Sequence, residues 1–400
     1  MKPIRIFDSM KISGCLLSFF MLVFGTTAFP QEGSKGYKFK NVILLPFTSI
    51  KNQGITNNCY IYAMTSLLES ELKQQGKADT NFSEMYFVRS IYMQKAEKFM
   101  RMHGKMYFTG GGELNDVPDV ITRYGLVPEG SYTGLKKGET GYNQMALEDS
   151  LRNFLKNLAT ASTPLLVSGW QKQVSAILDN YLVTLPDSLQ ITDKRSFPID
   201  YAKSLNISPD NYILLSSFMA YPYYKYFPLE VPDNWSWGQA YNLPLDKLIE
   251  VVRDALEHGY TVAWAADDSE IWFSWRNGVA ILPDVLNPGP AFGSPVDWNK
   301  LNERQKIKEI LSFNNRVNEM TITEELRQRA FDSYATTDDH SMHIVGLAKD
   351  QDGKNFFIVK NSWGTRNPYN GLIYVSEAYF LYKTVSIMLN KKALPPGLIK

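Results

Sequence analysis

KNQGITNNCYIYAMTSLLESELKQQG, residues 51–76, is the stretch that decides the fold. Apolar side chains follow Cys59 at helical spacing, at Ile61, Met64, Leu68 and Leu72. Asn57 or Asn58 can serve as the N-cap, and Gly76 lies just past the last apolar residue. The pattern predicts a buried helix that begins at Cys59.

The position of Cys59 at the start of a helix has a chemical consequence. A cysteine acts as a nucleophile only as the thiolate, and a helix N-terminus favours negative charge. A catalytic cysteine also needs a proton acceptor nearby. That base must come from elsewhere in the chain.

The first 28 residues have the order of a secretory signal peptide. Basic residues come first, at Lys2, Arg5 and Lys11, before the apolar stretch 16–24 and the small residues 25–28. We expect cleavage after Ala28 and export to the periplasm or the medium, with residues 29–41 as a linker. An uncleaved anchor is the alternative, but the apolar stretch is shorter than the roughly 20 residues that span a bilayer.

Only two cysteines occur in the chain, and Cys15 lies within the predicted signal peptide. Because the apolar stretch follows Cys15 instead of preceding it, a lipoprotein anchor is disfavoured. The exported protein keeps Cys59 alone, which excludes an internal disulfide and a zinc site built of thiolates. We therefore expect no metal, and Cys59 is either an inert buried side chain or a reactive one.

The charges of the chain nearly cancel, with 42 basic and 41 acidic residues among 400. No strongly basic face is expected, so nucleic acid is not predicted as a partner. The hydrophobic fraction of 44% is typical of a soluble globular protein.

The search for a base is short, because the chain has four histidines: His103, His258, His340 and His343. His340 heads the alternating apolar segment DHSMHIVGLA, which predicts a strand. His258 closes a predicted helix, and His103 lies in a charged, solvated stretch. His343 is the rival, but a step of three residues along a strand turns its side chain to the face opposite His340. We predict that His340 is the base.

A third group must hold the imidazole of His340 in the right tautomer. The segment VKNSWG supplies Asn361 at the end of the next predicted strand. Trp363 can shield the hydrogen bond between Asn361 and His340 from water.

These segments resemble those of the papain superfamily of cysteine peptidases. KNQGITNNCYIYA resembles the segment around the nucleophile, DHSMHIVG resembles the histidine strand, and KNSWG resembles the asparagine motif. The resemblance implies a catalytic triad of Cys59, His340 and Asn361. It also implies that Gln53 and the backbone N–H of Cys59 form the oxyanion hole, where they stabilise charge that appears only in the transition state.

The segment GGGELNDVPDVITRYG, residues 110–125, is similar to the family's diglycine segment. The resemblance implies that Gly111 and Gly112 bind an extended peptide through the main chain, because the missing side chain lets the substrate approach. Trp363 completes the expected substrate-binding residues.

His340 follows Cys59 by 281 residues, about twice the separation typical of papain itself. Together with FSEMYF and LPLDKLIEVVRDALEHGYTVAWAAD, this layout resembles the bleomycin hydrolase and aminopeptidase C branch. The resemblance implies an α+β papain-like two-lobe fold over residues 42–400. A helical lobe faces a β-barrel-like lobe, with a large, mainly helical insertion at about 141–240.

The expected activity is hydrolysis of peptide bonds, with a peptide as partner and no cofactor. The resemblance favours aminopeptidase action and implies a homo-oligomer, which is a hexamer in relatives. In relatives the C-terminal arm brings its carboxylate to the amino group of the substrate, whereas the tail NKKALPPGLIK is shorter here. An endopeptidase of the same fold and a catalytically inactive peptide-binding module are the alternatives.

Overall fold

A computed structural model of the protein describes residues 36–77, 80–160, 169–185, 190–191, 194–289 and 296–399. The predicted signal peptide lies outside the described residues. The described residues pack as one unit, in which helices and a large mixed sheet confirm the predicted α+β class. The described residues contain no helix long and apolar enough to cross a membrane.

The helices are α1 (Cys59–Gln74), α2 (Glu84–Arg101), α3 (Asp116–Tyr124), α4 (Met145–Thr160), α5 (Trp170–Leu182), α6 (Pro198–Ser204), α7 (Leu245–Glu257), α8 (Glu303–Ile310), α9 (Glu324–Asp332) and α10 (Glu377–Lys383). Short 3-10 turns are η1 (Glu129–Ser131), η2 (Pro209–Asn211), η3 (Trp298–Lys300) and η4 (Lys391–Ala393).

The strands are β1 (Lys40–Leu44), β2 (Gln190–Ile191), β3 (Lys194–Arg195), β4 (Tyr212–Ser216), β5 (Tyr226–Pro228), β6 (Gln239–Asn242), β7 (Val262–Ala266), β8 (Phe273–Ser274), β9 (Val279–Ala280), β10 (His340–Lys349), β11 (Asn355–Lys360), β12 (Leu372–Ser376) and β13 (Thr384–Asn390). In the main sheet they run in the order β5-β6-β4-β13-β7-β10-β11-β12-β9-β8, with β1 pairing to β10, while β2 and β3 pair separately.

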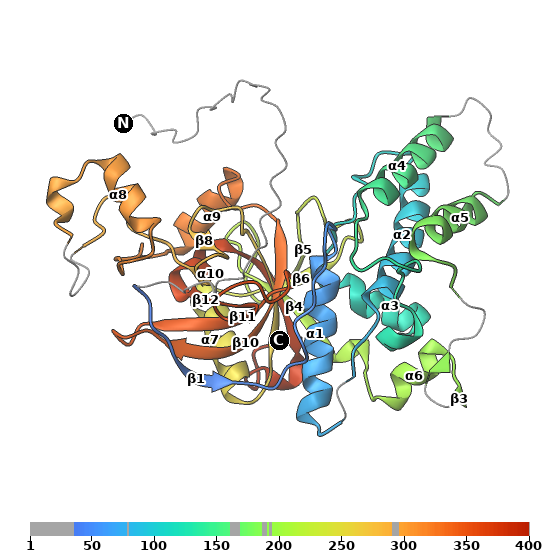
Figure 1. Cartoon of the computed structure of the whole chain (residues 1–400), viewed down its shortest axis with the longest axis horizontal. Helices are drawn as coiled ribbons and strands as arrows, with labels where there is room; N and C mark the ends of the chain where they lie inside the picture. Colours follow the sequence, from blue (N-terminus) through green and yellow to red (C-terminus); the bar gives the residue numbers. More distant parts are fainter. Residues whose placement is uncertain are drawn as a thin grey trace, which may run out of the picture. The chain divides into compact units, whose positions relative to one another are not determined.

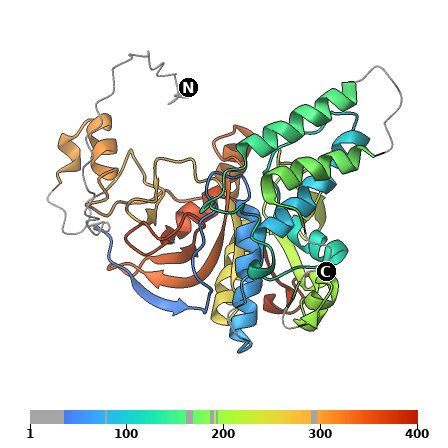
Figure 2. The ribbon, with the colours of Figure 1, turned by 45° about the vertical axis from the view of Figure 1, so that its right-hand side comes forward.

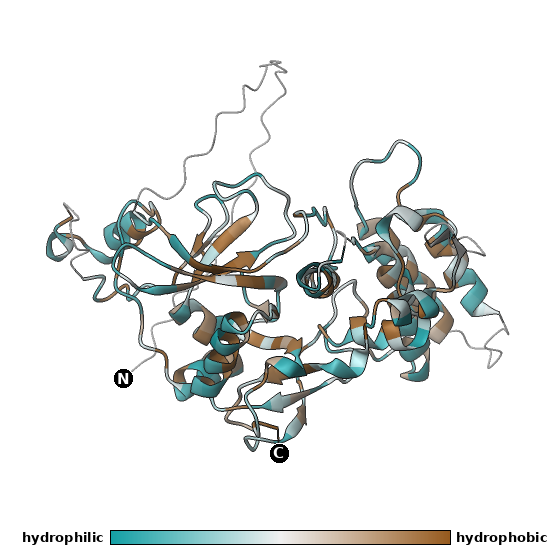
Figure 3. Ribbon diagram, turned by 90° about the horizontal axis from the view of Figure 1, so that it is seen from below, coloured by the Kyte–Doolittle hydropathy of each residue, from teal (hydrophilic) through white to brown (hydrophobic). Residues whose placement is uncertain are grey.

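Helix α1 lies between the two lobes, with the sheet on one side and the helices α2 to α6 on the other (Figure 1). The same order holds in the turned view of Figure 2, and Figure 3 shows α1 end on between strands and helices. The contacts of α1 agree with these views, because α1 touches β10 and β7 on one side and α2 and α3 on the other. The helix is buried along most of its length, so the two lobes share its core.

Strand β7 shows how the sheet is covered on both faces. Val262, Trp264 and Ala266 pack in the cluster that contains the apolar face of α7. Ala263 and Ala265 point the other way, into the cluster of α1 and the helical lobe. Since side chains alternate along a strand, the small alanines on one face let α1 approach the sheet closely.

The inserted segment, residues 141–240, begins with helices and ends with strands. Helices α4 and α5 place leucines and a valine, fully buried, against α2: Leu147, Leu151, Leu155, Val174 and Leu178. Strand β4 is buried at every residue and pairs with β13, and β5 and β6 continue the sheet beyond it. The described part of the insertion is mainly helical, as expected, but its apolar run YILLS extends the sheet, because such a run suits a strand buried on both faces.

The folded domain also begins before the expected boundary at residue 42. Lys40 pairs with Lys349, and Tyr37 is buried in a cluster with Phe356. Phe39 stacks on Tyr374 with ring centroids 4.0 Å apart. The described part of the expected linker, residues 36–41, therefore packs against the sheet, because its aromatic side chains find apolar partners there.

Gly346 gives a test of the contact between β1 and β10. A Cβ atom at Gly346 would lie 2.2 Å from the backbone oxygen of Ile43, whereas one at Gly130 would meet nothing within 4 Å. We expect Gly346→Ala to lower the free energy of unfolding by about 1–3 kcal/mol, because backbone must move. Gly130→Ala should change it by less than about 0.5 kcal/mol. Urea unfolding followed by tryptophan fluorescence measures both, and equal stabilities would contradict the register.

Candidate active site

Cys59 opens α1 at the point where the helix meets the sheet. Asn58 is the N-cap residue, but its side chain donates to Gln144 Oε1 over 2.6 Å and does not cap the helix. Cys59 is partly exposed and lines a cavity of about 260 Å³, together with His340, Gln53, Gly111 and Gly112. Cys59, His340 and Ser341 line the same cavity, so the thiol lies beside the start of β10.

His340 is held in place by Asn361 and Trp363. Its Nε2 lies 2.8 Å from Asn361 Oδ1, which also accepts from the backbone N–H of Ser362 over 2.7 Å. An oxygen that accepts at this position requires the proton on Nε2, which leaves Nδ1 to take a proton. The indole of Trp363 stacks on the imidazole with centroids 4.8 Å apart and an interplanar angle of 26°. The structure thus brings the three side chains together on β10 and the loop after β11.

Gln53 lies on the same cavity and is oriented by the loop of Asn361 and Trp363. Its Oε1 accepts from Ser362 Oγ over 2.5 Å, and its backbone N–H donates to Ser362 O over 2.8 Å. Its Nε2 donates to Thr56 O over 3.0 Å. An amide nitrogen has two N–H donors, so one of them is left for an oxyanion.

Gly111 and Gly112 form a wall of the cavity where no side chain fits. A Cβ atom at Gly111 would lie 1.9 Å from Asp233 Oδ2, and one at Gly112 would lie 2.6 Å from the ring of Tyr60. Lys95 supports this loop from within the protein, since its ammonium donates to Gly111 O and, over 2.9 Å, to Thr109 O. The loop is therefore fixed, with its backbone next to Cys59.

Carboxylates surround the reacting pair. Asp233, Asp338 and Asp339 line the cavity of Cys59. A second cavity of about 610 Å³ lies on the Trp363 side of His340 and carries Asp268, Asp339 and Glu148 among its walls. Sequence reasoning missed these acids, although the pair Asp338 and Asp339 directly precedes His340 in the chain.

The electrostatics of Cys59 differ from the sequence expectation. Burial, with a smaller contribution from Asp338, Asp268 and Asp233, raises the pKa of the thiol to about 12, although the backbone of Ser341 opposes the shift. Burial lowers the pKa of His340, and Asp268 and Asn361 oppose that shift. The favourable helix N-terminus is therefore outweighed, and charge can form on Cys59 only with an opposite charge beside it.

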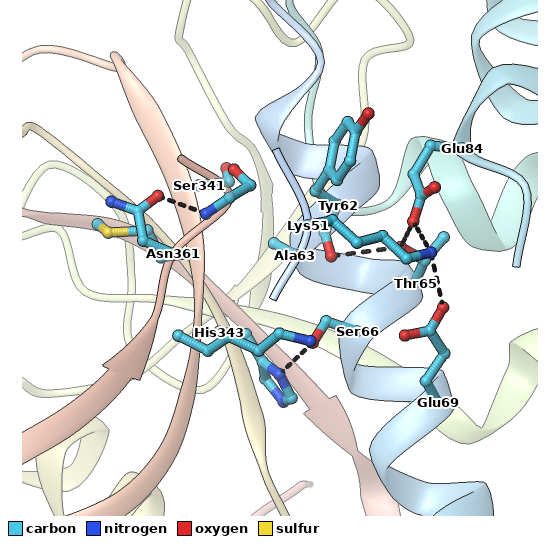
Figure 4. A pocket seen from close by; sticks show the side chains of 13 residues that line it. Lys51, Tyr62, Ala63, Thr65, Ser66, Glu69, Glu84, Ser341, His343 and Asn361 are labelled. Atoms are coloured by element: carbon cyan, nitrogen blue, oxygen red, sulfur yellow. Dashed lines mark hydrogen bonds and ion pairs between the residues drawn. The ribbon is translucent and has the colours of Figure 1, made fainter. Parts of the chain in front are cut away.

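His343 lies on the other face of β10 from His340, as the strand parity predicts. Its Nδ1 lies 2.8 Å from Ser66 Oγ of α1, in a cavity of about 20 Å³ (Figure 4). Burial, and then the charge of Lys360, hold the pKa of His343 well below its usual value. It is a neutral side chain between helix and sheet.

A buried ionic network lines the small cavity that contains His343 (Figure 4). Lys51 binds Glu84 over 2.7 Å and Glu69 over 3.2 Å. Lys360 donates to Ser66 Oγ over 2.8 Å and to Thr48 Oγ1 over 3.1 Å. Since Lys51 lies two residues before Gln53 and Lys360 directly precedes Asn361, the network fixes the segments that carry site residues.

The charges of this network are only partly balanced. Burial raises the pKa of Glu84 to about 7, against the opposing effect of Lys51. Burial opposes the charge of Lys51 too, but Glu84, Glu69 and Glu129 outweigh it and raise the pKa of Lys51. Lys51 therefore stays charged and stabilises two carboxylates that burial disfavours.

The C-terminal segment packs away from these cavities. Pro395, Pro396, Gly397 and Leu398 form a pocket with Tyr224, which lies just before β5, and with Lys247, Glu250 and Val251 of α7. Among the tail residues that the structure describes, up to Ile399, none lines the cavities of Cys59 and His340. The described residues also include no group of three His, Cys, Asp or Glu side chains arranged to bind a metal ion.

Comparison with known proteins supports the same fold. Residues 291–400 match the model of the Peptidase C1-like family. PepW from Lactobacillus rhamnosis HN001 aligns over 90% of this chain and 83% of its own, with 18% identity and a TM-score of 0.68. No curated protein matches the sequence.

Two further structures align more loosely. One is from work on the mite allergens Blo t 1 and Der p 1, with 14% identity, a TM-score of 0.39 and coverage of 86% of this chain and 67% of that chain. The other is bromelain from Ananas comosus with the E64 inhibitor, with 14% identity, a TM-score of 0.35 and coverage of 85% and 92%. The match of residues 291–400 and the alignment with PepW confirm the resemblance to papain-like cysteine peptidases.

Lys51 offers a test of the buried network. Lys51→Met leaves the carboxylates of Glu69 and Glu84 without a counter-charge, and we expect a loss of about 3–5 kcal/mol in the free energy of unfolding. Lys247→Met removes an exposed pair with Glu250 and should leave the free energy of unfolding nearly unchanged.

The loss at Lys51 should also depend on pH. Folding raises the pKa of Glu84, and such a carboxyl group destabilises the folded state once the pH exceeds the pKa that the group has in the unfolded chain. The loss of stability in Lys51→Met should therefore be larger at pH 8 than at pH 5. Urea titrations at both pH values measure this. A deficit that matches Lys247→Met, or one that does not grow with pH, would contradict the network.

Proposed function

We propose that this chain, which has the papain-like fold, is a cysteine peptidase with Cys59 as nucleophile, His340 as base and Asn361 as the residue that orients the base. The observation that carries the proposal is the cavity that Cys59 shares with the first residues of β10. Cys59 lines this cavity together with His340 and Ser341. The imidazole has Nε2 bound to Asn361 and Nδ1 available.

The first step is transfer of the Cys59 proton to Nδ1 of His340. Each ion alone is disfavoured by burial, but a thiolate beside an imidazolium gains mutual attraction in the same low-dielectric site. Asp268 adds to the stability of the imidazolium, since its charge raises the pKa of His340. The thiolate then attacks the carbonyl carbon of the scissile peptide bond.

The oxyanion that forms is held by the free Nε2 N–H of Gln53 and the backbone N–H of Cys59. His340 then gives its proton to the leaving amine, and an acyl-enzyme remains on the sulfur. Water attacks that thioester while His340 again takes a proton. Gln53 and Asn361 are linked through Ser362, so the oxyanion donor and the orienting amide keep a fixed spacing.

Removal of N-terminal residues is the finer proposal, supported by the resemblance to the bleomycin hydrolase branch. The inserted segment also narrows the groove, because Asp233 lies against Gly111 where an extended peptide would pass. Endopeptidase action remains the alternative within the same chemistry. The predicted signal peptide leads us to propose that these peptides are met outside the cytoplasm.

A second candidate function is peptide binding without catalysis. The raised pKa of Cys59 favours it, because a thiol that never ionises is not a nucleophile. The buried bond between His340 and Asn361 and the free N–H of Gln53 favour the peptidase, since binding alone needs none of these groups at these positions.

One peptide in two forms, with a free and with an acetylated N-terminus, tests the proposal. We expect purified protein to remove the first residue of the free form and to leave the acetylated form intact, as followed by mass spectrometry. Cys59→Ala should lower the rate by at least about 10³-fold, because the nucleophile is lost. Cleavage inside the acetylated form would make the chain an endopeptidase. Binding of both forms with no cleavage would make it a binding module.

A further inference from the structure

The wall of the Cys59 cavity on the side of the two glycines is acidic. Asp233, Asp338 and Asp339 contribute to it, and no lysine or arginine belongs to the described residues that line it. The cavity on the Trp363 side differs, because it includes Arg152, which pairs with Glu148 and Asp149. The wall next to Gly111 and Gly112 therefore carries three carboxylates and no basic side chain that pairs with them.

Asp233 reaches this wall from the inserted segment, in the loop between β5 and β6. Its carboxylate lies directly over Gly111, at 1.9 Å from the place of a Cβ atom. Thr109 Oγ1 donates to its Oδ1 over 3.3 Å, which leaves Oδ2 as an acceptor toward the cavity. A substrate main chain that runs along the glycines would place its next group against this carboxylate.

Asp338 and Glu113 form a second acidic feature, of a different kind. Glu113 follows Gly112 and is only 1% exposed, with Oε2 accepting from Ser386 Oγ over 3.3 Å. The two carboxyl groups lie close enough to share a proton, and apart from each other Glu113 Oε1 and Asp338 Oδ2 are buried with no donor among the residues that the structure describes. A buried acceptor without a donor destabilises the fold, so this pair is stable only with a shared proton or a cation beside it.

Lys95 does not supply that cation. It is 1% exposed, and its ammonium is bound to the backbone oxygens of Thr109 and Gly111 behind the loop. Burial also lowers the pKa of Lys95 to about 8. The cavity side of Asp233 and Asp338 is thus open to a positive group from outside.

We infer that Asp233 and Asp338, with Glu113 behind Asp338, form a subsite that binds a cationic group of the substrate on the glycine side of the scissile bond. The inference rests on the proposed peptidase function and names its substrate class. Two groups share the required chemistry, the α-ammonium of a peptide N-terminus and the side chain of a lysine or arginine. Either one can donate charge-assisted hydrogen bonds to the carboxylates of Asp233 and Asp338.

Two pairs of fluorogenic amides distinguish these sources. The first pair is an N-acetylated dipeptide amide with lysine or norleucine before the residue at the scissile bond. The second pair is a single-residue amide with a free or an acetylated amino group. We expect kcat/KM of full-length protein to favour the cationic member of at least one pair by about tenfold or more, because a charged group gains the two carboxylates.

Asp233→Asn and Asp338→Asn should each reduce that preference by about tenfold, while cleavage of the neutral members reports that the variants are folded and active. Asp246→Asn is the matched control, since it removes the same charge from an exposed site at the start of α7 and should keep the preference. Calorimetric binding of the peptides to Cys59→Ala protein gives the same comparison without cleavage.

A preference for the lysine side chain or for the free amino group, lost in the Asp233 and Asp338 variants, supports the subsite and names its ligand. Equal rates and affinities for cationic and neutral members, or a preference that both variants retain, overturn it. If cleavage depends on Cys59 but shows no preference, the subsite fails and the peptidase stands. If Cys59→Ala protein prefers the cation but wild type cleaves nothing, the peptidase fails and the subsite stands.

Discussion

The charge of Lys51 inside the protein is the constraint on which the arrangement of the site depends. Its ammonium binds Glu69 of α1 and Glu84 of α2, so the loop before Cys59 cannot move independently of either helix. Lys360 continues the network to β11 through Ser66 and Thr48. Gln53 and Asn361 therefore keep fixed positions relative to Cys59, because each lies within two residues of a buried, bonded lysine.

The same burial that fixes the site also suppresses its charges. Cys59 and His340 both shift toward their neutral forms, and nearby carboxylates oppose a lone thiolate. In the proposed reaction a proton moves from Cys59 to His340, which forms the thiolate without changing the net charge of the site. The surrounding acids underlie the proposed subsite, since carboxylates attract positively charged groups and repel negatively charged ones.

The sequence predicted what local periodicity and order determine. Apolar spacing predicted that α1 begins at Cys59, and strand parity predicted that His340 and His343 lie on opposite faces of their strand. It did not predict that Asp233 lies against Gly111. Asp233 belongs to a loop of a long insertion, and the position of that loop depends on how the whole segment from α4 to β6 packs. Nor could it predict the raised pKa of Cys59, which depends on burial and on carboxylates from three distant segments. The strands of the insertion were missed because a short buried apolar run can be helix or strand.

The rate of alkylation of Cys59 by iodoacetamide, measured from pH 5 to 9 and mapped by mass spectrometry, tests most directly whether His340 generates the thiolate. Wild-type Cys59 should react faster than a free thiol near neutral pH. His340→Ala should react more slowly than a free thiol, because without a proton acceptor the pKa of Cys59 stays near 12. Slow alkylation of the wild type, unchanged in His340→Ala, would contradict the account.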